Sequence, residues 1–260
     1  MNERPLRVEF GDGIVTATLN RPEVLNAINI ALAEELGKLL EEVAGRKDLR
    51  VLILTGAGDR AFSAGTDLKE RRGLNPEELW AHSRKLHRVC DLIEQIPQAT
   101  ICAIAGYCLG GAFDLALATD IRVAADNAEL GFPEMTLGAF PGTGGPVRLP
   151  RLVGPAWAKE ILLTARRVGA AEALRLGLVQ YVFSRGDLLS QAQTLARRIL
   201  GVSPLGARAV KQIINRGMTM SIEDATALAN ALRQPLEGTK DYQEGLQAHF
   251  EKRPPKFRGE

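Results

Sequence analysis

The stretch ATICAIAGYCLGGAFDLALATDIRVAA, residues 99–125, decides the fold, because two apolar runs in it enclose a glycine-rich turn and a short helical pattern. Residues 100–106 predict a buried strand, residues 110–118 a short helix entered through glycines, and residues 120–125 another strand. Strands that alternate with helices pair in parallel. The stretch therefore predicts an α/β protein with a parallel sheet.

The same stretch has the length of a membrane helix, since Asp114 is the only charged side chain between residues 99 and 119. Gly106, Gly110 and Gly111 interrupt it, and a bare carboxylate in lipid would be costly. We therefore expect no membrane association.

Working outward toward the N-terminus, residues 7–20 alternate about the turn GDG and predict a hairpin. Asn29 can cap a helix with leucines at helical spacing, and VLILTG, residues 51–56, predicts another buried strand. A polar loop is expected over residues 57–75. It is followed by a helix that begins with the capping pattern at Asn75 and ends near residue 96.

Toward the C-terminus, the chain beyond Gly131 is rich in glycine and proline, then predicts a helix from about Pro155 and a strand at LVQYVF, residues 178–183. After Gly201 only helical patterns remain. We predict a core domain over residues 1–200 and a helical C-terminal lobe over residues 201–260.

Composition excludes several classes of protein. The 260 residues are 45% hydrophobic and 25% charged, typical of a folded globular chain. The 33 lysines and arginines nearly balance 31 acidic residues, so no nucleic-acid partner is expected. Three cysteines, an odd number outside metal-ligand spacings, favour a reducing compartment, and the first ten residues lack the pattern of an export signal. These features predict a cytoplasmic protein.

Common cofactor and nucleophile motifs are absent from the sequence. Neither GAGDR nor PGTGG supplies the lysine of a phosphate-binding loop, and the glycines of GYCLGG have the wrong spacing for a dinucleotide site. Ser63 lacks the preceding glycine of a nucleophile elbow, and the three histidines form no metal-binding pattern. No metal site is predicted.

Two segments place backbone donors near carboxylates. The segment FSAGTDLKE, residues 62–70, is a small-residue loop after a strand, and in LGGAFD the amides of Gly110 and Gly111 lie at a helix N-terminus. Two converging donors of this kind can form an oxyanion hole. Tight turns account for the same glycines, so spacing alone leaves both interpretations open.

Two carboxylates favour the functional interpretation. Asp114 lies one turn after Gly110 in a helix of alanine, phenylalanine and leucine, where an unpaired acid is costly. Glu134 follows twenty residues later among apolar residues. Paired carboxylates are a known way to divide acid and base roles.

The chain resembles the enoyl-CoA hydratase/isomerase, or crotonase, superfamily over nearly its whole length. The resemblance rests on TATLNRPEVLNAIN, VLILTGAGDRAFSAGTDLKE, AIAGYCLGGAFDLALATDIRVAA and ELGFPEMTLGAFPGTGGPVRLPRLVG, in the family's order. The segment DLKER and the ending FEKRPPKFRGE are similar to the methylglutaconyl-CoA hydratase branch. The resemblance implies a spiral of β-β-α repeats with a helical C-terminal lobe, assembled as a homotrimer or hexamer.

The resemblance also implies site residues. The thioester oxygen of an acyl-CoA substrate would accept hydrogen bonds from the amides of Thr66 and Gly111, and CoA would lie against residues 25–27 and Ala64. No cofactor is implied beyond CoA as part of the substrate. The implied substrate-binding residues are Leu25, Ala27, Ala64, Thr66, Asp67, Leu68, Lys69 and Gly110, and the candidates for the CoA phosphates are Lys69, Arg71, Arg72, Lys252 and Lys256.

The two catalytic carboxylates of hydratases in this family are glutamates, whereas the matching positions here are Asp114 and Glu134. We predict an enoyl-CoA hydratase in which both orient a water. Dienoyl-CoA isomerases resemble this Asp-then-Glu pattern, but they carry another aspartate eight residues after the glutamate, where this chain has Gly142. Isomerisation by Glu134 alone, and a non-catalytic acyl-CoA binder, remain the alternatives.

Overall fold

The computed structural model describes residues 4–260, so the first three residues of the predicted core domain lie outside the described range. The chain begins with the predicted hairpin of β1 (Leu6–Gly11) and β2 (Ile14–Leu19), whose turn residues Asp12 and Gly13 have positive φ. Helix α1 (Ile30–Gly45) follows, and the Asn29 side chain accepts a hydrogen bond from the Leu32 amide as its N-cap. The capping residue predicted for this helix is thus confirmed.

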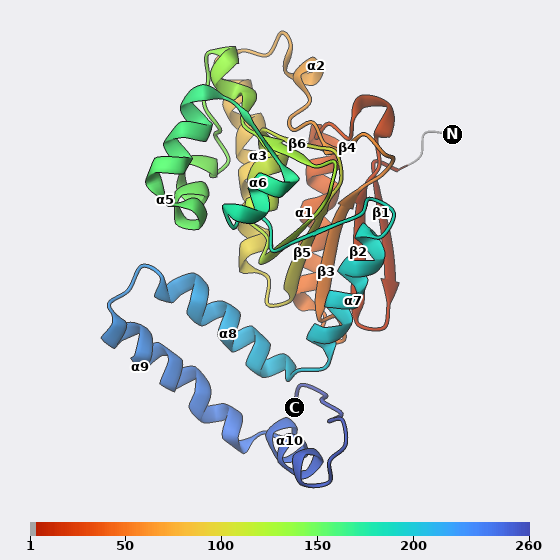
Figure 1. The fold of residues 1–260 in the computed structure, drawn as a ribbon, viewed down its shortest axis with the longest axis vertical. Helices are drawn as coiled ribbons and strands as arrows, with labels where there is room; N and C mark the ends of the chain where they lie inside the picture. The colour runs from red at the N-terminus through yellow and green to blue at the C-terminus, as the bar shows by residue number, and fades with distance from the viewer. Residues whose placement is uncertain (1–3) are drawn as a thin grey trace.

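Two sheets run side by side through the body (Figure 1). The larger has the order β1-β2-β3-β5-β7-β10 and the smaller β4-β6-β8-β9; pairing is parallel except for β1 with β2 and β8 with β9. The remaining strands are β3 (Val51–Gly56), β4 (Ala61–Ser63), β5 (Ala99–Ile104), β6 (Tyr107–Leu109), β7 (Ile121–Ala125), β8 (Glu129–Gly131), β9 (Arg167–Gly169) and β10 (Tyr181–Phe183).

A repeated β-β-α unit produces this arrangement. In the pairs β3/β4, β5/β6 and β7/β8, the chain passes from the larger sheet to the smaller within a few residues and then forms helical structure. The helices that close the three units are α3 (Pro76–Gln95), α4 (Gly111–Leu117) and α5 (Gly145–Thr164). This is the spiral expected from the family resemblance, and the α/β class is confirmed.

The structure contains elements that the sequence did not predict. Residues 57–75 are not all loop, because they contain β4 and the short helix α2 (Leu68–Arg71). The helix predicted from about Pro155 is confirmed, because the non-helical Gly154, with φ 78°, separates it from an earlier segment of α5 that begins at Gly145 and was not predicted. The strands β6, β8 and β9 were not predicted, because three-residue strands are too short to show an alternating pattern.

The central strands of the larger sheet, β3, β5 and β7, are buried on both faces. One face packs against a core that includes Leu36 and Leu40 of α1 and Val89 and Ile93 of α3. The other packs against α7 (Leu188–Leu200), which also supplies buried alanines. Burial on both faces explains why the central strands are almost continuously apolar.

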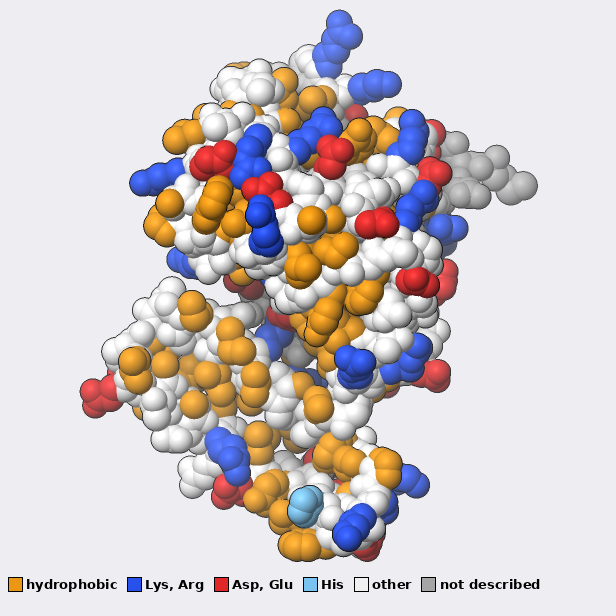
Figure 2. Space-filling view, viewed as in Figure 1, with side chains coloured by type: hydrophobic (Ala, Val, Ile, Leu, Met, Phe, Trp, Pro, Cys, Tyr) orange, Lys and Arg blue, Asp and Glu red, His pale blue; other side chains and the backbone are white. Residues whose placement is uncertain are grey.

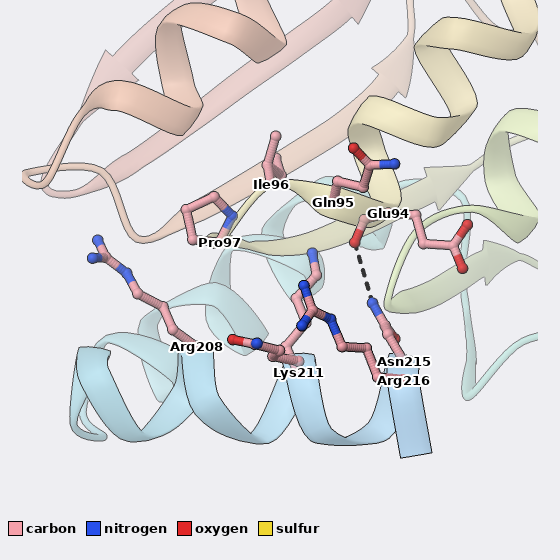
Figure 3. A pocket seen from close by; sticks show the side chains of 9 residues that line it. Glu94, Gln95, Ile96, Pro97, Arg208, Lys211, Asn215 and Arg216 are labelled. Carbon is pink, nitrogen blue, oxygen red and sulfur yellow. Dashed lines mark hydrogen bonds between the residues drawn. The ribbon is translucent and has the colours of Figure 1, made fainter. Parts of the chain in front are cut away.

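The C-terminal helices extend away from the body (Figure 1). They are α8 (Pro204–Gly217), α9 (Ile222–Arg233) and α10 (Lys240–Phe250), with a short helical turn, α6 (Ala170–Arg175), before α7 in the body. Helix α8 contacts the body through Lys211, 2.8 Å from the Asp120 carboxylate, and Asn215, which donates to the Glu94 carbonyl (Figure 3). Among residues 4–260, no helix combines the length and apolarity needed to cross a bilayer.

Candidate active site

A cavity of about 340 Å³ lies where α2, α3, α4 and the short helix η2 (Pro133–Leu137) meet. Its wall is mainly apolar, with a few polar side chains and glycines. The lining residues are Ala64, Thr66, Leu68, Arg71, Leu79, His82, Ser83, Leu86, Gly110, Gly111, Asp114, Pro133, Glu134, Leu137, Ala139, Phe140, Gly142 and Thr143.

Two backbone amides on neighbouring segments meet at this cavity. Thr66 pairs with Ile28 in an isolated parallel bridge, in which the Gly65 carbonyl accepts from the Ile28 amide and the Asp67 amide donates to the Ile28 carbonyl. The amide of Thr66 therefore points away from Ile28. Gly111 is the first residue of α4, where helix geometry leaves the amide without a partner. A β-carbon on Gly111 would lie 3.7 Å from the Thr66 nitrogen, so the two amides are close enough to share one acceptor.

The close approach of the two segments depends on Gly65. Its φ is +92°, and a β-carbon there would lie 2.4 Å from the Leu109 carbonyl oxygen. The amide of Gly110, which the sequence grouped with that of Gly111 as a helix-terminal donor, instead donates to the Gly131 carbonyl at 2.9 Å. The donor pair is therefore Thr66 and Gly111.

The buried side chain of Asn26 holds residues 25–27 beside Ala64. Leu25 and Asn26 both have positive φ, and the Leu25 carbonyl accepts from the Ala64 amide at 2.9 Å. The fully buried Asn26 side chain donates to two backbone carbonyls and accepts from the Arg21 amide. Asparagine is favoured here because it tolerates the left-handed conformation and satisfies these backbone groups.

Asp114 is 1% exposed and projects from α4. Its Oδ2 accepts from the Thr143 hydroxyl, while Oδ1 has no hydrogen-bond partner among the described residues. Burial raises the pKa of Asp114 to about 6, against the lowering effect of the Thr143 hydroxyl and the Gly145 amide. Thr143 thus holds one oxygen, and the other is buried next to Gly145.

Glu134 projects from η2, and its Oε2 is also buried without a partner in residues 4–260. Burial, with the nearby Asp114 charge, raises the pKa of Glu134 to about 7. A β-carbon on Gly110 would lie 2.6 Å from Glu134 Oε1, so glycine at 110 makes room for the carboxyl beside the donor pair. The cavity therefore combines two amide donors with two carboxyls that titrate near neutrality.

Other predicted residues occupy different positions. Leu68 lines the cavity, and Leu25 and Ala27 are partly buried behind Ala64. Asp67 does not line the cavity: it caps α2 and lies 2.9 Å from the Arg21 guanidinium. Of the candidates for CoA phosphates, Arg71 lines the cavity, Lys69 and Arg72 are exposed, and Lys252 and Lys256 belong to the tail after α10.

Sequence reasoning missed one wall of the cavity. Leu79, His82, Ser83 and Leu86 of α3 all line it, at the spacing of one helix face. His82 is 5% exposed, and its Nδ1 has no partner in the described chain. The helical period indicates that these residues share a face, but only the packing of α3 shows what that face covers.

No group of three or more histidine, cysteine, aspartate and glutamate side chains in residues 4–260 is arranged to hold a metal ion. Backbone amides can stabilise negative charge on an oxygen atom, and carboxyl groups can move protons.

The spiral and its site define a protein of the crotonase fold. The sequence profile of the enoyl-CoA hydratase/isomerase family matches residues 9–260, and the chain belongs to that family.

Individual relatives agree with this assignment. The chain is 38% identical to crotonyl-CoA hydratase of Syntrophomonas wolfei over 96% of both proteins. It is 38% identical to mitochondrial methylglutaconyl-CoA hydratase of Mus musculus, over 97% of this chain and 82% of that protein. A crystal structure of enoyl-CoA hydratase from Bacillus anthracis superposes with a TM-score of 0.97 at 40% identity, covering 98% of this chain and all of the other.

Proposed function

We propose that the protein is an enoyl-CoA hydratase that adds water across the 2,3 double bond of a 2-enoyl-CoA thioester to give a 3-hydroxyacyl-CoA. The observation that carries the proposal is that one cavity brings together two carboxyl oxygens, on Asp114 and Glu134, and two amides, none of which has a partner within residues 4–260. The hydratases among the relatives support the same reaction.

In the proposed mechanism the amides of Thr66 and Gly111 donate to the thioester oxygen. Addition at Cβ converts the thioester to an enolate, whose oxygen carries more negative charge than the ground-state carbonyl. Donors already in place stabilise that charge selectively, which lowers the barrier. The N-terminal end of α4 adds a favourable dipole at the same point.

The two carboxyls divide the proton transfers. Asp114 and Glu134 orient one water; ionised Asp114 takes its proton as the oxygen attacks Cβ, and protonated Glu134 delivers a proton to Cα. The water oxygen and one hydrogen remain on Cβ, and proton exchange with solvent restores both carboxyls. The higher pKa of Glu134 favours its role as the acid, and the lower pKa of Asp114 its role as the base.

The CoA portion of the substrate would lie along residues 25–27 and Ala64, outside the donor pair. The left-handed conformations of Leu25 and Asn26 turn backbone groups of this segment toward Ala64 rather than into a helix or strand. Leu68, which is 59% exposed at the cavity rim, would cover part of the CoA portion.

The test is loss of the conjugated thioester absorbance of crotonyl-CoA with wild type, Asp114→Asn, Asp114→Glu and Glu134→Gln. Hydration by wild type that falls in the Asn and Gln variants is expected. The matched control is Asp126→Asn, an exposed aspartate at the end of β7. Hydration at the parent rate by Glu134→Gln contradicts the mechanism.

The same assay distinguishes hydration from two alternative functions. If wild type is inactive and Asp114→Glu hydrates crotonyl-CoA, the native reaction is another one, and 3-enoyl-CoA isomerisation is measured next. If acyl-CoA binds and no unsaturated thioester turns over, the protein is a binder. Gly142 lines the cavity without a carboxylate, which favours hydration over dienoyl-CoA isomerisation.

We also propose a homotrimer or a hexamer of two trimers. Val210 and Ile214 of α8 and Met218, which follows its last residue, are each 55–70% accessible, while Ile222 of α9 and Phe250 of α10 are 88% and 79% accessible. Hydrophobic side chains gather over the C-terminal helices in Figure 2. Such a surface suits burial against further copies of the chain. Light scattering on the purified protein tests the assembly, and Ile214→Glu should dissociate it.

A cytoplasmic location completes the proposal. Cys90, Cys102 and Cys108 are free and buried, and burial raises the pKa of each thiol. Unpaired cysteines suit a reducing compartment.

A further inference from the structure

A hydroxyl from another part of the chain binds the Asp114 carboxyl. Thr143 lies in the loop between η2 and α5, is 5% exposed and lines the cavity. Its hydroxyl donates to Oδ2 of Asp114. Within residues 4–260 no other side chain forms a hydrogen bond to this carboxyl. The Thr143 hydroxyl is therefore the contact that can fix the orientation of the acid.

Two glycines allow the loop to approach the acid. A β-carbon on Gly145 would lie 2.7 Å from Oδ1 of Asp114, so the loop backbone packs directly against the carboxyl. Gly144 has φ +117°, and a β-carbon there would overlap Nη1 of Arg148. A side chain at either position would displace the loop. Both glycines therefore support the contact between Thr143 and Asp114.

An arginine holds the backbone of Thr143 in place. Nη1 of Arg148 donates to the Thr143 carbonyl at 3.0 Å. Nη2 of the same guanidinium, whose side chain is 14% exposed, lies 2.7 Å from the Glu94 carboxylate and 3.2 Å from that of Asp91, both on α3. Hydrogen bonds between charged groups are stronger than neutral ones. The loop is thus anchored to α3, the helix that forms one wall of the cavity.

The orientation of Asp114 bears directly on the rate of hydration. The terminal torsion of an aspartate side chain is broad, so its carboxyl rotates unless a partner holds it. A displacement of about 1 Å at a reacting group can cost about 100-fold in rate. Asp114 is also one methylene shorter than the glutamate that the family resemblance implies at this position. A short base that must meet a water therefore depends on a group that fixes its carboxyl.

We propose that Thr143 is a positioning residue for hydration: its hydroxyl holds the Asp114 carboxylate in the orientation from which it takes a proton from the attacking water. The inference rests on the proposed hydratase function and adds a residue to it. Thr143 transfers no proton itself. A carboxylate oxygen has two lone pairs, so Oδ2 can accept from Thr143 and from a water together.

The same hydroxyl opposes the effect of burial on Asp114. Burial raises the pKa of Asp114, whereas the Thr143 hydroxyl lowers it, because a donor stabilises the charged form. The Arg148 charge lowers this pKa as well. Loss of the hydroxyl should therefore raise the pKa of Asp114 further. The other titratable groups that interact with Asp114 or share its cavity are Glu134 of η2, Cys90 and His82 of α3, Cys108 of β6 and Arg71 of α2.

The experiment compares Thr143→Val, which keeps the shape of threonine without its hydroxyl, with Thr143→Ser, which keeps the hydroxyl. Thr143→Val should lower kcat for crotonyl-CoA about 10-fold, the loss expected for one hydrogen bond to a charged group. Its KM should stay near that of wild type, since valine preserves the cavity wall. In the pH profile of kcat/KM, the acid limb should move up by about one pH unit, while the alkaline limb of Glu134 stays.

Thr143→Ser should restore the kcat and the acid limb of wild type. Thr164→Val is the matched control, because it removes an exposed hydroxyl at the far end of α5 that donates to the Glu160 carbonyl. It should hydrate crotonyl-CoA as wild type does. If Thr143→Val does not fold, Thr143→Ala removes the same hydroxyl without adding bulk and carries the same expectation.

Failure of this proposal differs from failure of the hydratase function. Hydration by wild type, with the same kcat and acid limb in Thr143→Val, rejects the positioning role alone. Equal losses in Thr143→Val and Thr143→Ser also reject it, because they trace the effect to packing rather than to the hydroxyl. Absence of hydration by wild type rejects the hydratase function.

Urea unfolding then tests the contact without activity. Because the folded-state pKa of Asp114 lies above its ordinary value, native stability falls as pH rises through that pKa. Loss of the hydroxyl extends this fall, so the unfolding free energy of Thr143→Val relative to wild type should decrease between about pH 6 and pH 8. A difference that does not change over this range shows that Thr143 does not stabilise the carboxylate of Asp114.

Discussion

Replacing Asp114 by asparagine should make the protein more stable at alkaline pH while it removes the base for hydration. Asparagine has nearly the same volume and keeps a carbonyl that can accept from Thr143. The change removes an ionisable group that is 1% exposed. Because burial favours the protonated acid, ionisation of Asp114 destabilises the native state.

The magnitude follows from the pKa of about 6 in the folded protein and the ordinary value of 3.8. The folded state holds its proton to higher pH than the unfolded chain, so native stability falls as pH rises from about 4 through about 6. The full cost at pH 8 is about 3 kcal/mol. Most of it, about 2 kcal/mol, develops between about pH 4 and pH 8.

The measurement is urea unfolding of wild type and Asp114→Asn from pH 4 to pH 8 at one protein concentration, because assembly couples stability to concentration. The free energy of unfolding of the variant relative to wild type should rise by about 2 kcal/mol over this range. Asp126→Asn should show no such trend, since that side chain is exposed. If the difference in unfolding free energy between Asp114→Asn and wild type stays constant with pH, burial does not raise the pKa of Asp114 as argued.

Three further predictions concern activity and folding. The kcat/KM for crotonyl-CoA should be bell-shaped with its maximum between about pH 6 and 7, since Asp114 must be ionised and Glu134 protonated; a flat profile excludes this division of roles. Gly110→Ala should lower kcat about 100-fold by displacing Glu134, whereas Gly142→Ala should not, since a β-carbon there meets only the Phe140 carbonyl oxygen, at 4.0 Å. Asn26→Ala should cost about 3 kcal/mol of unfolding free energy in urea by leaving buried backbone groups without partners, and an unchanged midpoint would contradict this.

Local patterns in the sequence were sufficient to predict the long helices. Asn29 and Asn75 cap α1 and α3 as predicted, because a capping side chain bonds to amides only two or three residues away. The short strands β6, β8 and β9 could not be predicted, since their pairing partners lie twenty or more residues away and three residues carry no period of their own. The β-β-α spiral came from the family resemblance rather than from periodicity.

The sequence by itself determined which residues could do chemistry: an aspartate in an apolar helix, a glutamate in an apolar turn, and glycines that free backbone amides. The family resemblance implied the amides of Thr66 and Gly111 as donors. Only the tertiary structure showed why the neighbouring Gly110 amide does not join them, because it donates to the Gly131 carbonyl. The tertiary structure also placed Arg71 of α2 against Ser83 of α3 in the wall of the cavity. Such contacts join segments far apart in the chain, and packing of the whole spiral fixes them.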